Sequence, residues 1–365
     1  MILHLLTDDK FSDYVVEQFS AKEMCSEFVL LSDTSEMIHY HYLNKSRLVN
    51  PWDIREIGPL LEDFKRYNAV VFHGYFLHWQ EWLLNRWPEG VKLVWVCWGG
   101  EIYGQPDIKS SFLMPISKFI NFVHRLGRKR GKKDEIFPKA LIAKSDYCMT
   151  NVKEEYEFVK KYLRTNIKHL WFTYYSINEM IGPLMNERCA GNNIFMGNSA
   201  SIENNYFDVW LRLKSIGIGD RKIITPLSYG DPWAKNVFRK WGHAILGDNF
   251  NPLIDFMPRN EYNALMLSCP IMIQAHRREQ AHGNIVTGIW LGMRVYLSEK
   301  GIDYKHFKSI GCKVYSIEKD LRRSNPNVFT PMTDEDVAYN RQILLSIYGR
   351  EHVDATNREL VKELA

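Results

Sequence analysis

Short apolar runs alternate with helix-length amphipathic segments along most of the chain. Most runs lack polar alternation, which is typical of parallel strands covered by helices on both faces. Their spacing of roughly 20–40 residues indicates βαβ units. The first series of predicted strands comprises residues 1–6, 27–31, 69–74, 92–99, 146–150 and 168–172. The second series comprises residues 193–198, 222–226, 243–247, 270–274, 294–298 and 312–316.

A linker-like segment separates the two series. Residues 177–193 contain the Gly, Pro and Asn that favour loops. A chain of 365 residues is also longer than most domains with a single hydrophobic core. We therefore predict an α/β protein with two Rossmann-like, doubly wound domains, at residues 1–180 and 190–332, that face a central cleft. Residues 333–365 are expected to form helices whose apolar stripe could pack back on the N-terminal domain.

Composition narrows the class of protein. Hydrophobic residues make up 45% of the chain and aromatic residues 13%, which indicates an ordered globular protein. The net charge of +4 is too small to indicate nucleic-acid binding. The six cysteines form no CxxC pair and several lie in apolar runs, so we expect reduced thiols. The start lacks a signal-peptide pattern, and no apolar stretch reaches the roughly 20 residues of a membrane span, so we expect a soluble, cytoplasmic protein.

Unusual residues follow the strand at 193–198. Gly197 would let the backbone approach a ligand, and Asn198 or Ser199 could cap a helix that begins just after them. The free N–H groups and the dipole at such a helix start suit a phosphate group. The alternative is an ordinary strand-to-helix turn with a good cap.

A second cluster follows the strand that ends near residue 274. Arg277 or Arg278 could neutralise a diphosphate by bidentate contact, and Glu279 could bind a sugar or ribose hydroxyl. Gly283 and Asn284 precede an amphipathic helix, so the N–H groups there could hold phosphate oxygens.

Other interpretations of this region remain open. The cluster could be a salt-bridged surface loop, and a zinc site formed by His276 and His282 has no third ligand in view. Tyr229, after the strand at 222–226, could stack on a nucleobase or belong to the core.

The strand ends of the N-terminal domain carry the candidates for catalysis. His73 and Gly74 end one predicted strand, and Gly99, Gly100 and Glu101 end its neighbour. His73 and Glu101 are candidates for a general base, or for holding an acceptor hydroxyl, because both side chains can accept a proton. The alternatives are a buried histidine near the core and a helix-capping carboxylate.

The spacing of apolar residues in 110–133 predicts an amphipathic helix, and a run of basic residues follows at its end. Such a pattern fits a helix that lies on an anionic membrane surface. The alternative is a core helix followed by a solvated loop, and nucleic-acid binding is less economical because the aromatic residues do not alternate with the charges. The predicted apolar face comprises Leu113, Ile116, Phe119, Ile120, Val123 and Leu126. The basic residues are Arg125, Arg128, Lys129, Arg130, Lys132 and Lys133.

Taken together, these blocks resemble a known family of bacterial enzymes. The blocks are FHG at 72–74, WGGEIY at 98–103, GNS at 197–199 with Asn204 after it, PLSYG around Tyr229, and RREQAHGN at 277–284 before the strand MRVYL. Their order and spacing over residues 65–300 are similar to those of the TDP-N-acetylfucosamine:lipid II N-acetylfucosaminyltransferases, glycosyltransferase family 56. This sequence has Glu101 where the family has aspartate, and Glu279 where it has glutamine.

The resemblance implies a GT-B architecture and a function. The expected reaction moves 4-acetamido-4,6-dideoxygalactose from a dTDP-sugar to a polyprenyl-diphosphate-linked saccharide, in surface polysaccharide synthesis such as that of enterobacterial common antigen. It would take place at the cytoplasmic face of the bacterial inner membrane. No DxD-type metal pair follows a predicted strand, so we expect no metal ion or other cofactor. The alternative is a non-catalytic partner that binds a nucleotide sugar.

The resemblance also implies roles for particular residues. His73 and Glu101 would be catalytic, and Gly74, Gly99 and Gly100 would bind the acceptor. The expected donor-binding residues are Gly197, Asn198, Ser199, Asn204, Tyr229, Arg278, Glu279, Gln280, Gly283 and Asn284.

Overall fold

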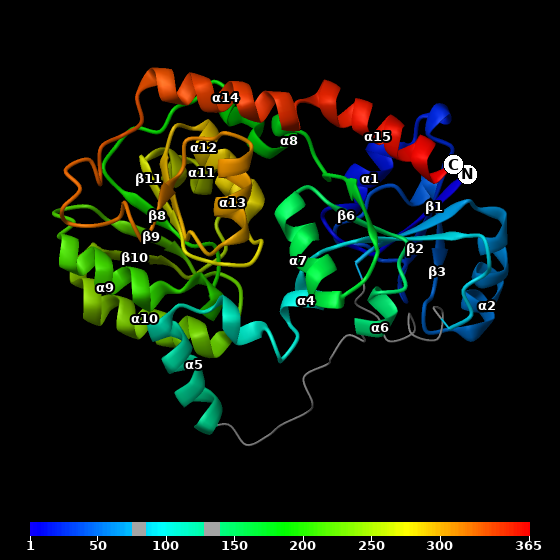
Figure 1. The fold of residues 1–365 in the computed structure, drawn as a ribbon, viewed down its shortest axis with the longest axis horizontal. Coiled ribbons are helices and arrows are strands. Elements are labelled where there is room, and N and C mark those ends of the chain that lie inside the picture. Colours follow the sequence, from blue (N-terminus) through cyan, green and yellow to red (C-terminus); the bar gives the residue numbers. More distant parts are fainter. Residues whose placement is uncertain (75–84, 128–138) are drawn as a thin grey trace. The chain divides into compact units, whose positions relative to one another are not determined.

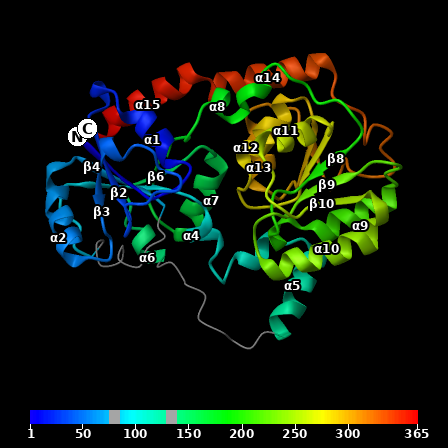
Figure 2. The same cartoon turned by 180° about the vertical axis from the view of Figure 1, so that it is seen from behind.

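The chain folds into two compact units, each built around its own parallel sheet (Figure 1). The structure is a computed structural model, and it describes residues 1–74, 85–127 and 139–365. Unit 1 comprises Met1–Gln105, Asp134–Ser176 and Tyr348–Ala365, and unit 2 comprises Pro106–Lys133 and Ile177–Ile347. Both termini belong to unit 1, where they are neighbours in two opposite views (Figures 1 and 2).

Unit 1 contains a seven-stranded parallel sheet in the order β3-β2-β1-β4-β5-β6-β7. The order reverses between β1 and β4, as in doubly wound folds that bind ligands at this point. The strands are β1 (Ile2–Leu6), β2 (Ser26–Leu31), β3 (Ser46–Val49), β4 (Ala69–His73), β5 (Lys92–Val96), β6 (Tyr147–Thr150) and β7 (Lys168–Trp171). The helices are α1 (Ser12–Phe19), α2 (Ile54–Asp63), α4 (Gly100–Tyr103), α6 (Lys139–Ile142), α7 (Lys153–Leu163) and α15 (Arg350–Leu364).

The C-terminal helix α15 forms part of the core of unit 1. Leu360, Val361 and Leu364 lie in the same buried cluster as the strand residues Ile2 and Val71. At its end, the Ala365 carbonyl accepts a hydrogen bond from Asn68 at 2.6 Å. The apolar stripe of the C-terminal helix therefore completes the sheet's covering layer.

Unit 2 contains a six-stranded parallel sheet in the order β10-β9-β8-β11-β12-β13, which reverses between β8 and β11. Helices α9 and α10 cover one face, and α11, α12 and α13 cover the other (Figure 1). The strands are β8 (Ile194–Met196), β9 (Ile223–Pro226), β10 (Phe250–Leu253), β11 (Ile271–Gln274), β12 (Arg294–Leu297) and β13 (Tyr315–Ser316). The helices are α5 (Pro115–Gly127), α8 (Ile177–Ile181), α9 (Tyr206–Ile216), α10 (Pro232–Leu246), α11 (Arg259–Leu267), α12 (His282–Trp290), α13 (Ile302–Ser309) and α14 (Asp334–Tyr348).

Two doubly wound α/β units confirm the predicted fold class, but one predicted strand is wrong. Residues 243–247 end α10 instead, and the strand of this βαβ unit is β10, after the turn at Gly247. Pro232 begins α10, and Asp231 caps it by accepting a hydrogen bond from the Ala234 N–H. A capped amphipathic helix of 15 residues incorporates the short apolar run at its end.

Helix α5 groups with unit 2, although the sequence placed residues 110–133 in the N-terminal domain. Asp208 on α9 accepts hydrogen bonds from the N–H groups of Ile116 and Ser117, both at 2.9 Å, and so caps the start of α5. Within the part of the chain that the structure describes, no helix is both long and apolar enough to cross a membrane.

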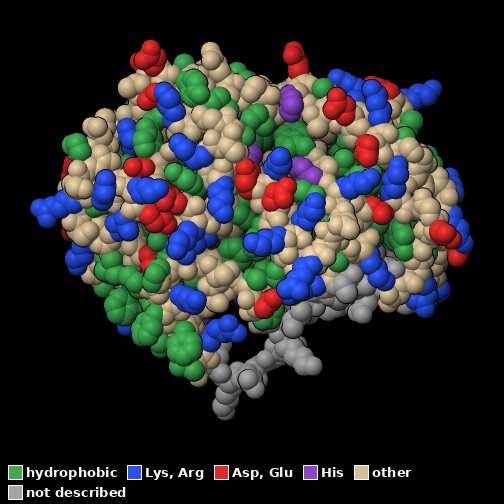
Figure 3. Space-filling model, in the orientation of Figure 1, with side chains coloured by type: hydrophobic (Ala, Val, Ile, Leu, Met, Phe, Trp, Pro, Cys, Tyr) green, Lys and Arg blue, Asp and Glu red, His purple; other side chains and the backbone are tan. Residues whose placement is uncertain are grey.

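The apolar face of α5 is largely exposed. Leu113, just before the helix, is buried, and Ile120 packs against the core of unit 2. Figure 3 shows hydrophobic side chains gathered over α5, next to the residues drawn in grey. The exposed side chains are Ile116, Phe119, Phe122, Val123 and Leu126, with exposed fractions from 37% to 71%. The basic residues Arg128, Lys129, Arg130, Lys132 and Lys133 lie outside the described residues.

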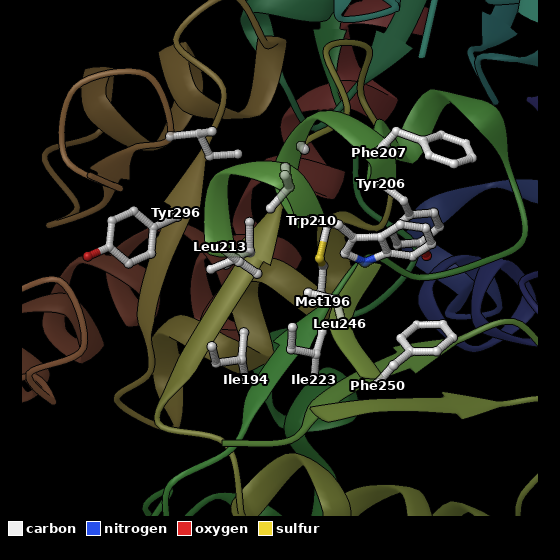
Figure 4. Packing of buried hydrophobic residues seen from close by; sticks show 14 of the residues in the cluster. Ile194, Met196, Tyr206, Phe207, Trp210, Leu213, Ile223, Leu246, Phe250 and Tyr296 are labelled. Atoms are coloured by element: carbon white, nitrogen blue, oxygen red, sulfur yellow. The ribbon is translucent and has the colours of Figure 1, made fainter. Parts of the chain in front are cut away.

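The core of unit 2 lies between β8, β9 and helices α9 and α10 (Figure 4). The Trp210 ring stacks on the Tyr206 ring at 5.3 Å, and the Phe250 ring meets Trp210 edge-on at the same distance. Tyr206 is fully buried, so its hydroxyl group must find a partner inside the fold. That partner is a carbonyl of the loop after β8, which fixes the loop to the core.

Candidate functional site

The site in unit 2 begins at Gly197, directly after β8. Its φ of +71° favours glycine, and a Cβ there would lie 2.2 Å from the Tyr206 hydroxyl. Its N–H donates to the Ile273 carbonyl at 3.0 Å, and its carbonyl accepts from Gln274 Nε2 at 3.1 Å. Gly197 therefore holds β8 and β11 together where the strand order reverses.

Asn198 connects the ends of three strands. Its Nδ2 donates to the Tyr229 hydroxyl, after β9, at 3.2 Å. Its Oδ1 accepts from Gln280 Nε2, after β11, at 2.7 Å. Asn198 and Gln280 are both buried, and Gln280 Oε1 has no hydrogen-bond partner among the described residues. Hydrogen bonds thus connect the loops after β8, β9 and β11 at the carboxyl edge of the unit 2 sheet.

Ser199 and Asn204 shape the loop that follows β8. Asn204 Nδ2 donates to the Ser199 carbonyl at 3.0 Å and lies 3.3 Å from its hydroxyl oxygen. The same carbonyl accepts from the Tyr206 hydroxyl at 2.9 Å. Asn204 is fully buried, and within the described chain its Oδ1 has no hydrogen-bond partner. The buried side chains of Asn204 and Tyr206 therefore hold the loop after β8 in this conformation.

The structure distinguishes the two arginines. Arg278 Nε donates to Glu203 Oε2 at 2.6 Å, and its Nη1 donates to the Glu279 carbonyl at 3.0 Å. Arg277 instead donates from Nη1 to the Leu113 carbonyl at 3.2 Å. Arg278 thus belongs to the edge formed by the loops after β8 and β11, and Arg277 supports the segment before α5.

The start of α12 lies on the same loop. Ala281 precedes the helix in the left-handed conformation, with φ of +57°, so the chain turns sharply into it. Gly283 and Asn284 fall in the first turn, where N–H groups have no acceptor within the helix. The Asn284 side chain forms a hydrogen bond with Tyr262 of α11. Burial raises the pKa of the Tyr262 hydroxyl, and this bond lowers it by less. Both predicted residues therefore stand where an anion would meet the helix dipole.

Hydrogen bonds of the Tyr229 backbone and hydroxyl connect it to the loop after β8, while the residue as a whole is 60% exposed. The Ala200 N–H donates to the Tyr229 carbonyl at 2.8 Å. Gly230 has φ of +115°, and a Cβ there would lie 2.8 Å from the Ala200 backbone. The exposed ring offers a flat surface, as stacking on a base requires.

Glu279 is partly buried and lies close to His282 and Asp303. Burial raises the pKa of Glu279, and the negative charge of Asp303 adds to this effect. Glu279, a predicted donor-binding residue, thus belongs to a charged group that also includes Asp303 of α13.

In unit 1, His73 ends β4 and is buried. Its Nε2 lies 3.2 Å from His4 Nδ1, and its Nδ1 lies 3.0 Å from the Tyr174 hydroxyl. Burial, with a contribution from His4, lowers the pKa of His73 well below its ordinary value. The imidazole is therefore neutral at pH 7, and Gly74 follows it with φ of +88°.

Glu101 is fully buried in the first turn of α4. Its Oε1 accepts from Trp95 Nε1 at 3.0 Å and from the Trp98 N–H at 3.2 Å. Gly99 precedes the helix with φ of +83°, and Gly100 is its first residue. The carboxylate thus supports the turn after β5, and its role as a catalytic residue remains a prediction, as does that of His73.

The sequence analysis missed several residues of these sites. Glu203 anchors Arg278, Asp303 approaches Glu279, and Tyr174 and His4 flank His73. Each lies far along the chain from its partner, and no local pattern marks it. The sequence offered one weak indication of Asp303, since acidic residues are enriched in the first turn of helices.

Comparison with known proteins identifies the fold. No protein-family profile and no curated protein sequence matches this chain. A glycosyltransferase from Rickettsia africae matches with a TM-score of 0.63 and 11% identity, over 100% of this chain and 98% of that one.

Two further solved glycosyltransferase structures match the fold of this chain. Sucrose-phosphate synthase from Thermosynechococcus elongatus matches with a TM-score of 0.54 and 9% identity, over 100% of this chain and 94% of that one. Anabaena HepE, in complex with UDP and glucose, matches with a TM-score of 0.51 and 10% identity, over 99% and 94%. These are GT-B glycosyltransferases, and the chain therefore has a GT-B-like fold of two Rossmann-like units, as predicted.

Replacing Gly197 with alanine is expected to lower the free energy of unfolding by roughly 2–4 kcal/mol, because φ is positive and the Cβ meets the Tyr206 ring. Denaturant unfolding of the purified variant measures this change. Gly58→Ala is the matched control. Apart from its chain neighbours and its own helix backbone, no described atom lies within 4 Å of a Cβ at Gly58 in α2. Helix propensity favours alanine there and the following Pro59 opposes it, so the free energy of unfolding should change by less than about 1 kcal/mol. Equal unfolding midpoints for the two variants would contradict the assigned constraint.

Proposed function

We propose that the protein is a glycosyltransferase that binds a nucleotide-sugar donor at the edge of the unit 2 sheet. One observation carries the proposal. The loops after β8 and β11 are joined by the Asn198–Gln280 and Glu203–Arg278 contacts where the strand order reverses. This is where open α/β sheets bind nucleotides. The solved structure of HepE, which shares the fold, contains UDP and glucose.

The donor's diphosphate is proposed to lie between the loop at Gly197 and the start of α12. Backbone N–H groups near Gly197 and Asn284, the helix dipole and the guanidinium of Arg278 would stabilise the negative charge. In this proposal no divalent ion bridges the diphosphate. Tyr229 would stack on the nucleobase, and Glu279 would accept a hydrogen bond from a sugar hydroxyl.

For the acceptor, we propose the edge of the unit 1 sheet around His73 and Glu101. In this proposal the Tyr174 hydroxyl, 3.0 Å from His73 Nδ1, would pass a proton from a substrate hydroxyl to the imidazole. Gly74, Gly99 and Gly100 would let the acceptor approach the backbone.

The family resemblance supplies the finer assignment. We propose that the donor is a dTDP-linked deoxy-amino sugar, 4-acetamido-4,6-dideoxygalactose, and that the acceptor is a polyprenyl-diphosphate-linked saccharide. The exposed apolar face of α5 supports a membrane-bound acceptor, because its side chains can enter the interface while the basic residues after it meet anionic lipid. The protein would then act on the cytoplasmic face of the bacterial inner membrane.

Donor binding tests the proposal directly. At about 100 times its dissociation constant, the preferred nucleotide should stabilise the protein by roughly 2.7 kcal/mol, and we expect dTDP to exceed UDP and GDP in a thermal-shift titration. Arg278→Ala should weaken binding by roughly 10–100-fold, because a charge-assisted hydrogen bond is lost. Arg239→Ala, at an exposed position on α10, should bind as the wild type does. No response to any nucleotide would remove the basis of the proposal.

A second candidate is a non-catalytic protein that binds a nucleotide sugar, and the burial of both His73 and Glu101 favours it. The double variant His73→Gln, Glu101→Gln separates the two functions. If the protein is an enzyme that uses these residues, the variant should bind dTDP normally but lose at least about 100-fold in sugar transfer to a lipid extract. Unchanged transfer would show that the catalytic assignment is wrong. No transfer by the wild type would favour the binding protein.

Membrane association is tested on α5. Phe119→Ser with Leu126→Ser should abolish most sedimentation with vesicles of anionic phospholipid, because each buried apolar side chain contributes about 1.5–3 kcal/mol. Trp241→Ser is the control, since Trp241 is similarly exposed on α10 of the same unit. If both variants sediment like the wild type, α5 does not bind the membrane.

A further inference from the structure

A group of acidic and histidine side chains lies beside the start of α13. Its members are Glu279 after β11, His282 at the start of α12 and Asp303 in the first turn of α13. One ligand atom from each, two carboxylate oxygens and an imidazole nitrogen, lies within 4.8 Å of the others. His282 and Asp303 are buried. Two carboxylates this close, in a site largely removed from water, repel each other.

The buried Asp303 carboxylate has two histidines as neighbours but no well-aligned hydrogen bond among the described residues. It is 2% exposed, and in the described structure neither of its oxygens accepts a hydrogen bond of acceptable geometry. The nearest groups are His276 Nδ1, 3.3 Å from Oδ2, and His282 Nδ1, 3.7 Å from Oδ1. Buried polar groups are nearly always satisfied, so such a carboxylate points to a missing partner.

The surrounding fold holds this geometry in place. The Ile302 N–H donates to the Arg277 carbonyl at 3.1 Å, which ties the start of α13 to the loop after β11. Gly301 permits the close approach, because a Cβ there would lie 3.0 Å from the His276 carbonyl. The His282 ring stacks on Phe307, with centroids 5.3 Å apart. The group is thus held by packing from two helices.

We propose that Glu279, His282 and Asp303 bind one divalent transition-metal ion, with Zn²⁺ as the favoured ion. Ligand atoms about 2.0–2.2 Å from a zinc ion lie roughly 3–4 Å apart, so a shift of under about 1 Å closes the site. Imidazole with carboxylates suits Zn²⁺, and the affinity order of divalent metals also favours it over Mn²⁺. His276 Nδ1 would orient the Asp303 carboxylate from outside the coordination sphere, a common arrangement.

The ion has a structural consequence that is separate from sugar transfer. It would join the starts of α12 and α13 within unit 2 and fix Glu279, at the edge of the proposed donor site. It would neutralise the two carboxylates, and it need not touch the diphosphate. The proposal therefore stands or falls independently of the donor's identity, and also of whether the protein is an enzyme.

Zinc binding to the full-length protein tests the inference. The experiment uses a Cys25→Ser background, because Cys25 is an exposed thiol that could bind zinc itself. After chelator treatment and desalting, the protein competes for Zn²⁺ with a chromophoric chelator. We expect one equivalent bound per chain and a higher melting temperature with Zn²⁺. Glu279→Gln and Asp303→Asn should each weaken binding by roughly 100-fold or more. Glu261→Gln, an exposed control on α11, should leave binding unchanged.

Circular dichroism of each variant separates a lost ligand from a lost fold. Glu279 is only partly buried, so Glu279→Gln is the decisive variant if Asp303→Asn does not fold. Less than about 0.2 equivalents of Zn²⁺ on the wild type overturns the proposal. Unchanged affinity in folded Glu279→Gln also overturns it, because the ion would then bind elsewhere on the protein. Because the measurement is of metal alone, a failure of sugar transfer cannot produce these outcomes.

Discussion

The pairing of β8 with β11 is the constraint on which the rest of unit 2 depends. The strand order reverses between these two strands, so the loops at their ends diverge to opposite faces of the sheet. Gly197 can join the two strand ends because it has no side chain to meet Tyr206, and the Asn198–Gln280 hydrogen bond then links the loops. Everything proposed for the donor follows from the polar edge that this pairing creates.

The charged side chains of the loop after β11 have specific partners within unit 2. Glu203 accepts a hydrogen bond from Arg278 Nε at 2.6 Å and so orients the guanidinium, which would reduce the entropy lost if Arg278 binds the proposed diphosphate. The same loop continues into Glu279 and the group around Asp303. The segment 276–284 therefore contributes side chains both to the proposed diphosphate site and to the group beside α13. A substitution there can act through either one.

The two units differ in how their candidate residues are presented. In unit 1, His73 and Glu101 are buried, and hydrogen bonds connect them to Tyr174, Trp95 and Trp98. In unit 2, Tyr229 is exposed and the start of α12 carries N–H groups without helical acceptors. The proposed nucleotide site therefore has an exposed surface, whereas the proposed acceptor site is a buried polar network. Helix α5 is a further contrast, because its apolar face remains exposed although it packs on unit 2 through Ile120.

The sequence by itself determined the strands that make up most of both sheets, because buried parallel strands appear as continuous apolar runs. It also identified Gly197, Asn198 and Arg278 as residues at strand ends, since strand ends carry ligand-binding loops whatever the details of packing. Only the tertiary structure decided that residues 243–247 belong to α10, that α5 joins unit 2, and that Asp303 approaches His282. Such outcomes depend on contacts between residues far apart in the chain, and no local pattern encodes those contacts.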